Sequence, residues 1–184
     1  MSLINNNVYT SAVVIIPPKV HWGSIQTIRK IYDRQFYRWM PHITLLYPFR
    51  PKNQFYELGQ KFSDICDQIK PFEITLNRIE YFFHGHQNYT MWLNPEPKEL
   101  LIELQTNLVK IVPACNDVNN YKNGYTPHLS IGQIKGKNKL HKTISELESK
   151  WKQLSFVLKE IYFISRENFK TSKFQIEKQF LLNF

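Results

Sequence analysis

Two short segments of this 184-residue sequence place a hydroxyl residue two positions after a histidine. They read Pro-His-Ile-Thr from residue 41 and Pro-His-Leu-Ser from residue 127. Each begins an apolar stretch that predicts a strand, and side chains two positions apart on a strand point to the same face. We therefore expect His42 and Thr44 to project together, and His128 and Ser130 to do the same.

If the two motif strands face each other, two imidazoles and two hydroxyls meet in one cleft. Such a set is suited to opening a phosphodiester without a metal ion. A neutral imidazole takes a proton from the attacking oxygen, and an imidazolium gives one to the leaving oxygen. The hydroxyls hold the non-bridging phosphate oxygens as charge develops on them. The ordinary pKa of imidazole is about 6.5, so both forms exist near neutral pH. The nearly symmetric layout leaves open which histidine is the base.

A third copy of the bare pattern, His141-Lys142-Thr143, carries less weight. It follows no proline and lies at the start of a polar helical stretch, so we interpret it as a chance match. The sequence His84-Gly85-His86 could suggest a metal site, but no third ligand is evident and we interpret it as a hairpin turn. We expect no metal and no cofactor, since phosphate-binding glycine motifs are also missing from the sequence.

The same order of strands and helices is predicted twice along the chain. The first half has predicted strands at 8–16, 41–49 and 72–83 and helices at 21–37 and 53–70. The second has strands at 88–93, 127–134 and 156–164, helices at 98–111 and 140–151, and a last strand at 174–182. This order indicates an internal duplication. We expect a single domain of two lobes, roughly 1–87 and 88–184, that pack together.

Composition narrows the class of protein. The formal net charge is +9 and is spread over both halves, which favours a polyanionic partner such as RNA or a nucleotide, or serves solubility alone. Hydrophobic residues make up 42% of the chain and aromatic residues 15%, which excludes a disordered protein. The two cysteines, Cys66 and Cys115, form no C-x-x-C motif and fit a reducing compartment.

The apolar run at residues 12–16 is too short to span a membrane, and no basic segment precedes it as in a signal peptide. We therefore expect a monomeric cytoplasmic protein with no membrane partner, with the nucleus left open as a location.

The two motif strands resemble those of the two-histidine (2H) phosphoesterase superfamily, which includes 2'-5' RNA ligase-like and RNA 2',3'-cyclic phosphodiesterase proteins. Residues 39–49 (WMPHITLLYPF) and 161–166 (IYFISR) resemble it as well, and the likeness covers nearly the whole chain. It implies an α+β fold with two pseudo-symmetric lobes, each an antiparallel sheet with helices on its outer face, around a central cleft. It also implies that His42, Thr44, His128 and Ser130 form a catalytic tetrad.

The activity implied by the resemblance is hydrolysis of the 2',3'-cyclic phosphate of RNA or nucleotides to a 2'-phosphate. If a ribose 5'-hydroxyl replaces water, the reverse reaction joins ends through a 2'-5' bond. Cleavage of 2'-5' oligoadenylate is an alternative, and so is a non-catalytic RNA- or nucleotide-binding module on the same fold.

Residues near the motifs are candidates for holding the substrate. Tyr125 and Phe49 could stack on a base or could be core aromatics. Arg50 and Arg166, and similarly Arg34 and Arg38, could bind phosphate or could be solvated charges. Tyr47 lies an odd number of residues from Thr44, so we expect it in the core.

Two loops complete the predicted site. The lysines of 135–139 could guide an RNA backbone, although a solvated turn is the plainer interpretation. The Asn-rich loop 116–124 leads into the second motif and is a candidate specificity element or lid.

Overall fold

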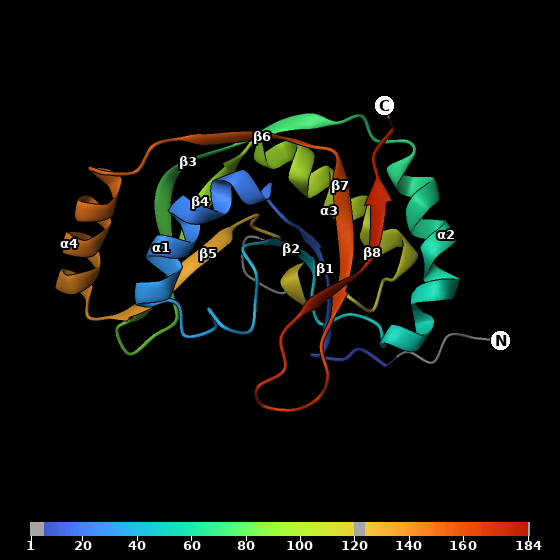
Figure 1. Cartoon of the computed structure of the whole chain (residues 1–184), viewed down its shortest axis with the longest axis horizontal. Coiled ribbons are helices and arrows are strands. Elements are labelled where there is room, and N and C mark those ends of the chain that lie inside the picture. The colour runs from blue at the N-terminus through green and yellow to red at the C-terminus, as the bar shows by residue number, and fades with distance from the viewer. Residues whose placement is uncertain (1–5, 120–123, 184) are drawn as a thin grey trace.

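Two antiparallel sheets with helices packed around them make up the computed structural model, which describes residues 6–119 and 124–183 (Figure 1). The strands are β1 Ser11–Ile15, β2 Ile43–Leu46, β3 Phe72–Phe83, β4 Asn88–Glu96, β5 Leu129–Lys135, β6 Leu154–Leu158, β7 Glu160–Ser165 and β8 Gln175–Leu181. The α-helices are α1 Trp22–Tyr32, α2 Phe55–Cys66, α3 Lys98–Ile111 and α4 Lys137–Glu148. Short 3-10 turns lie at η1 Lys19–His21, η2 Lys52–Gln54 and η3 Asp117–Asn119. The expected α+β class is confirmed.

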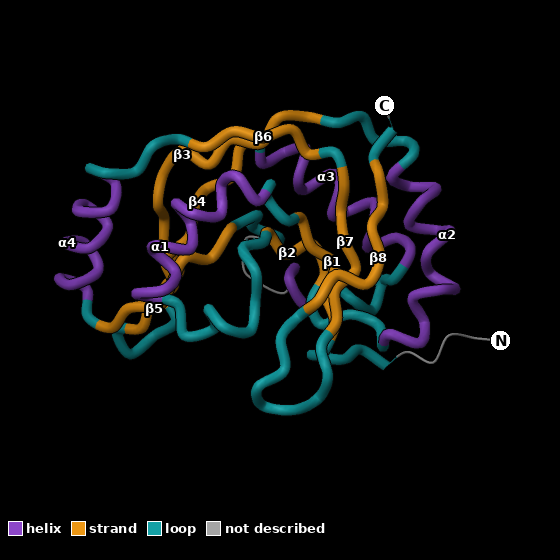
Figure 2. The backbone as a smooth tube through the Cα atoms, in the orientation of Figure 1, coloured by secondary structure: helices purple, strands orange, loops and turns teal. Residues whose placement is uncertain are grey.

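Each sheet has four strands. One has the order β2-β1-β7-β8 and the other the order β5-β4-β3-β6, and every pair of neighbours is antiparallel. The first sheet lies on the right of Figure 1 and the second on the left. In Figure 2, β3 and β6 run across the top of the molecule between the two sides. The motif strands β2 and β5 are both edge strands, one in each sheet.

The halves of the chain exchange strands. The last strand of the first half, β3, pairs with β4 and β6 of the second half, while β7 from the second half pairs with β1 of the first. Helices cross as well, because α1 packs on β5 and α3 contacts β2. The two repeated halves therefore do not coincide with the two sheets, and neither sheet is complete without strands from both halves.

The strand predicted over residues 156–164 is wrong as a single element. The structure divides it into β6, which pairs with β3, and β7, which pairs with β1 in the other sheet. Leu158 and Ile161 are both buried but lie three residues apart, so one continuous strand would point them to opposite faces. The break at Lys159 changes the phase and allows both to be buried.

The helix predicted over residues 21–37 ends earlier, at Tyr32. Asp33 has an extended backbone (φ −97°, ψ 109°), and its carboxylate accepts a 2.8 Å hydrogen bond from the backbone N–H of Gln35. Such a side-chain to backbone bond competes with continued helix formation. The early end places Asp33 beside β5, where it reaches the side chain of Gln133.

The helices bury their apolar faces against the sheets. Examples are Ile25 of α1, Phe62 of α2 and Leu104 of α3, each with at most 1% of its surface exposed. No helix in the described ranges has the length and apolarity that crossing a bilayer would require.

Candidate active site

The alternation of the motif strands separates packing from chemistry. Their core-facing side chains, all fully buried, are Ile43, Leu45, Leu129 and Ile131. The motif histidines and hydroxyls lie on the opposite face and are half-buried. This is the arrangement that a period of two residues predicts.

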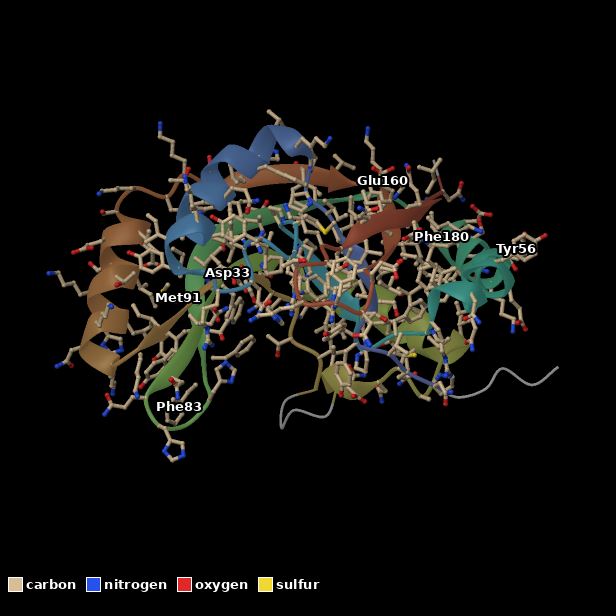
Figure 3. All side chains as sticks on the ribbon, turned by 60° about the horizontal axis from the view of Figure 1, so that its bottom comes forward. Asp33, Tyr56, Phe83, Met91, Glu160 and Phe180 are labelled. Atoms are coloured by element: carbon tan, nitrogen blue, oxygen red, sulfur yellow. The ribbon has the colours of Figure 1, made fainter. Side chains whose placement is uncertain are left out.

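A cleft of about 720 Å³ lies on this face. Thr44 of one sheet and His128 and Ser130 of the other line it directly. Its other lining includes the aromatic side chains Tyr9, Tyr47, Phe82, Phe83 and Tyr125. Figure 3 shows Phe83 near the tip of the hairpin between β3 and β4. The sheets thus bring parts of both motifs to one hollow, although they are more than 80 residues apart in the chain.

His42 lies just before β2 and is held by two contacts. Its Nδ1 is 2.7 Å from the carbonyl oxygen of Met40, and its ring stacks on Trp39 at 4.6 Å between centroids. Because a carbonyl can only accept, Nδ1 must carry the hydrogen, which leaves Nε2 of the neutral ring as an acceptor.

His128 is held in the same way. Its Nδ1 is 2.8 Å from the carbonyl oxygen of Thr126, again two residues earlier. The ring meets Phe82 edge to face at 5.0 Å and lies 6.0 Å from Trp92. Both motif histidines therefore have the tautomer in which Nε2 is left for a substrate.

Burial favours the neutral form of both rings. It lowers the pKa of His42 from 6.5 to about 4. The hydrogen bond to Met40 and the charge of Asp33 oppose this shift, and the positive charges of Arg29 and His128 add to it. Burial likewise lowers the pKa of His128, opposed by the bond to Thr126. The charge of His128 also acts to lower the pKa of His42, and His42 is not part of the cleft lining.

The lowered pKa of His42 predicts how stability changes with pH. Between about pH 6.5 and pH 4 the unfolded chain binds a proton at His42 and the folded chain does not, so the free energy of unfolding should fall as the pH falls. Below about pH 4 the loss in the free energy of unfolding that is due to His42 reaches about 3 kcal/mol. Urea unfolding at several pH values should show a shallower dependence in His42→Gln than in the wild type or in the exposed control His141→Gln. Equal slopes in all three proteins would contradict this.

Tyr125 joins the two motif strands. Its hydroxyl donates a 2.7 Å hydrogen bond to the backbone carbonyl of Thr44, and its ring lines the cleft with 7% of its surface exposed. Burial raises the pKa of this phenol, so it stays a donor. Tyr9 and Phe83 offer a base more surface, since 62% of each is exposed.

Phe49 and Arg50 lie away from the cleft. Phe49 is fully buried and packs 5.0 Å from Phe163 in an aromatic core, so it has no face for a base. Arg50 is 5% exposed, and its backbone carbonyl accepts a hydrogen bond from Ser11. Both residues follow the end of β2, where the chain turns inward.

Tyr47 is part of the cleft lining, whereas Arg166 is not. Burial raises the pKa of Tyr47, and the nearby charges of Arg166 and Arg38 oppose that rise. The guanidinium of Arg166 lies over the ring of Phe174 at 5.6 Å. Tyr47 packs against the small buried cluster that contains Val14 and Phe174, and it also lines the cleft, so its predicted core position is confirmed in part. It follows the last residue of β2, and strand alternation no longer applies there.

Gln133 is a cleft residue that strand alternation does not predict. It lies three positions after Ser130, but β4 pairs with β5 through a bulge in which Met91 faces Gly132 and Trp92 faces Ser130. The extra residue turns Gln133 back to the side of Ser130. Gly132 has a φ of 155°, and a Cβ there would lie 2.7 Å from the backbone carbon of Tyr32, so glycine allows α1 to approach.

His84 and His86 lie in the turn that joins β3 and β4. Positive φ at Gly85, His86 and Gln87 and a hydrogen bond from the Asn88 N–H to the Gly85 carbonyl confirm the predicted hairpin. His84 lines the cleft, and its Nε2 lies 2.9 Å from the Thr90 hydroxyl. The only sign of that role in the sequence is the place of His84 at a strand end.

A buried ion pair supports the site from behind. Arg29 is 2% exposed and bonds to the Asp33 carboxylate at 2.8 Å. Arg29 also donates to the carbonyl of Trp39, the residue that stacks on His42. The ion pair therefore links helix α1 to Trp39, the residue on which the His42 ring stacks.

Part of the candidate loop 116–124 also reaches the site. Asp117 and Val118 line the cleft, whereas residues 120–123 lie outside the described part of the chain.

Sequence comparison decides the family. Residues 17–169 match the 2'-5' RNA ligase superfamily, a span that covers most of the chain. The protein belongs to this superfamily. A similar protein from Geobacillus kaustophilus, "Putative phosphoesterase GK0864", is 27% identical over 122 residues, which are 66% of this chain and 67% of that protein. A similar protein from Oceanobacillus iheyensis, "Putative phosphoesterase OB1230", is 26% identical over 122 residues and covers 66% of this chain and 68% of its own.

Solved structures share the fold. Escherichia coli LigT complexed with phosphate has a TM-score of 0.57 at 16% identity and covers 97% of this chain and 100% of its own. The protein TT0787 of Thermus thermophilus has a TM-score of 0.61 at 14% identity, with 94% and 97% covered. The resemblance to the 2H phosphoesterases is confirmed, and so is the fold that it implied.

Proposed function

We propose that this protein is a metal-independent phosphodiesterase that opens the 2',3'-cyclic phosphate of an RNA end or a nucleotide and leaves a 2'-phosphate. The observation that carries the proposal is the matched pair of histidines. Each has Nδ1 against a backbone carbonyl and Nε2 left for the substrate, and each stands two residues before a hydroxyl on the same face.

The reaction follows from these groups. Nε2 of one neutral ring accepts a proton from water, whose oxygen forms a bond to phosphorus. The bond from phosphorus to the ribose O3' breaks, and the other ring, protonated at Nε2, gives its proton to O3'. The hydroxyls of Thr44 and Ser130 donate to the non-bridging oxygens.

We assign His42 as the base and His128 as the acid. Burial lowers the pKa of His42 to about 4, so the His42 ring is neutral at physiological pH, while the charges of Arg29 and Asp33 act on it in opposite directions. His128 must gain a proton on binding, and the negative phosphodiester in the cleft favours this because an adjacent opposite charge raises the pKa of an imidazole. Crystal structures of E. coli LigT with phosphate and with 3'-AMP hold ligands of the same chemical class.

An assay of the purified protein in EDTA tests the proposal. We expect turnover of 2',3'-cyclic nucleotides and of cyclic-phosphate-ended RNA, with a 2'-phosphate product and a bell-shaped pH–rate profile. Loss of turnover in EDTA would refute the metal-independent mechanism. If the protein cleaves only 2'-5' oligoadenylate, its substrate is the 2'-5' linkage and not the cyclic phosphate. If it binds these substrates but turns over none of them, it is a non-catalytic binding module.

A further inference from the structure

A second hollow continues from the cleft along the edge strand β5. It has a volume of about 680 Å³ and shares three lining residues with the cleft, namely His84, Thr90 and Gln133. The two hollows therefore adjoin at these residues. Beyond the shared residues it is lined by Arg34 and Lys135, and we call this extension the β5 groove.

Charge differs between the cleft and the β5 groove. Within the described ranges, the cleft lining includes Asp117 and no lysine or arginine, whereas the groove holds two cations. Neither cation is within 4 Å of a described carboxylate, while other basic side chains such as Lys52 form ion pairs. Two cations without a carboxylate partner, next to the cleft that holds the motif side chains, favour the binding of further phosphates.

Arg34 is held in place on the side of the cleft. Its backbone N–H and its Nε both donate to the side-chain oxygen of Gln133, at 3.1 and 3.3 Å. Gln133 in turn donates to Asp33 at 3.4 Å. The bond through Nε leaves both terminal nitrogens of the Arg34 guanidinium without a hydrogen-bond partner among the described residues. Arg34 is exposed, and a guanidinium restrained at Nε can bind a phosphate at a lower entropic cost than an unrestrained side chain.

We propose that the β5 groove binds the phosphates of the nucleotides on the 5' side of the reacting RNA end. This inference rests on the proposed function and narrows its substrate class. An RNA strand that ends in a 2',3'-cyclic phosphate can leave the cleft only toward its 5' side, and each further nucleotide adds one negative charge. Arg34 and Lys135 bind the phosphates of that strand. The favoured substrate is therefore a single-stranded oligonucleotide and not a mononucleotide.

Comparing substrates of different length tests the groove. We expect kcat/KM to be about tenfold higher for a trinucleotide ending in a cyclic phosphate than for the cyclic mononucleotide, because of the added charge-assisted contacts. Arg34→Ala and Lys135→Ala should each remove most of this gain and leave the mononucleotide rate unchanged. Lys61→Ala, an exposed position on α2 at the far end of the molecule, is the matched control (Figure 1).

Salt dependence adds a second readout. In a plot of log(kcat/KM) for the trinucleotide against log salt concentration, each groove variant should reduce the slope by about 0.7, as expected for one lost phosphate contact on a single strand. The proposal would be overturned if Arg34→Ala and Lys135→Ala lowered kcat/KM equally for the trinucleotide and the mononucleotide. It would also be overturned if both variants kept the wild-type preference for the trinucleotide.

Direct binding separates this proposal from the proposed function. Fluorescence anisotropy with a labelled trinucleotide ending in a 2'-phosphate should show weaker binding by Arg34→Ala and Lys135→Ala than by the wild type or Lys61→Ala, whether or not the protein turns over cyclic phosphates. Equal affinities in all four proteins would refute the groove while leaving the cleft chemistry intact.

Discussion

Replacing His42 or His128 by alanine should lower kcat for opening a 2',3'-cyclic phosphate by about a hundred- to ten-thousandfold. That range is what a positioned general acid or base contributes to a proton transfer. The double variant should be little slower than the worse single variant, because both proton transfers serve the same transition state. Steady-state kinetics with a cyclic nucleotide measures the effect.

The chain supplies its own control for this experiment. His141 also precedes a hydroxyl residue by two positions, but it is exposed on helix α4. His141→Ala should therefore keep the wild-type rate, and circular dichroism should show all three single variants folded. A motif variant that turns over substrate as fast as His141→Ala would refute the assignment of that histidine.

Among the substitutions considered, removing the carboxylate of Asp33 should cause the largest loss in the free energy of unfolding. Asp33→Ala leaves Arg29 buried without its charge partner, since Arg29 is 2% exposed and paired at 2.8 Å. Loss of one partner from a buried ion pair lowers the free energy of unfolding by about 3–5 kcal/mol. Urea unfolding at neutral pH measures this difference.

An exposed pair with the same spacing is the control. Lys142 and Glu146 are also four residues apart on a helix, but their side chains are 80% and 58% exposed. Glu146→Ala should cost no more than about 0.5 kcal/mol. The double variant Arg29→Met with Asp33→Leu, which removes both buried charges, should regain most of the lost stability. An Asp33→Ala protein as stable as Glu146→Ala would contradict the argument.

The motif strands were predictable because the information is local. A period of two residues is sufficient to place Ile43 in the core and Thr44 on the other face, and the same holds for Leu129 and Ser130. The break between β6 and β7 was also present in the sequence, as the odd spacing of Leu158 and Ile161. Two apolar runs separated only by Lys159 and Glu160 predict one strand when the phase of the alternation is ignored.

Residues outside regular strands were less predictable. Phe49 and Tyr47 both follow β2, yet one is in the core and the other lines the cleft. Gln133 reaches the cleft only because a bulge shifts the register of β5. In each case the direction of the side chain depends on backbone geometry that a fixed period does not describe.

The sequence by itself determined the pair of histidine and hydroxyl strands, their core and cleft faces, and the repeated order of elements. Only the tertiary structure decided that β3 and β7 exchange between the two sheets, that Asp33 and Arg29 are buried behind the site, and that the cleft continues into the groove at Arg34 and Lys135. The physical reason is range. Strand alternation depends on neighbouring residues. Strand exchange and groove shape depend on contacts between segments far apart in the chain, such as Ser11 of β1 and its partner Ser165 of β7.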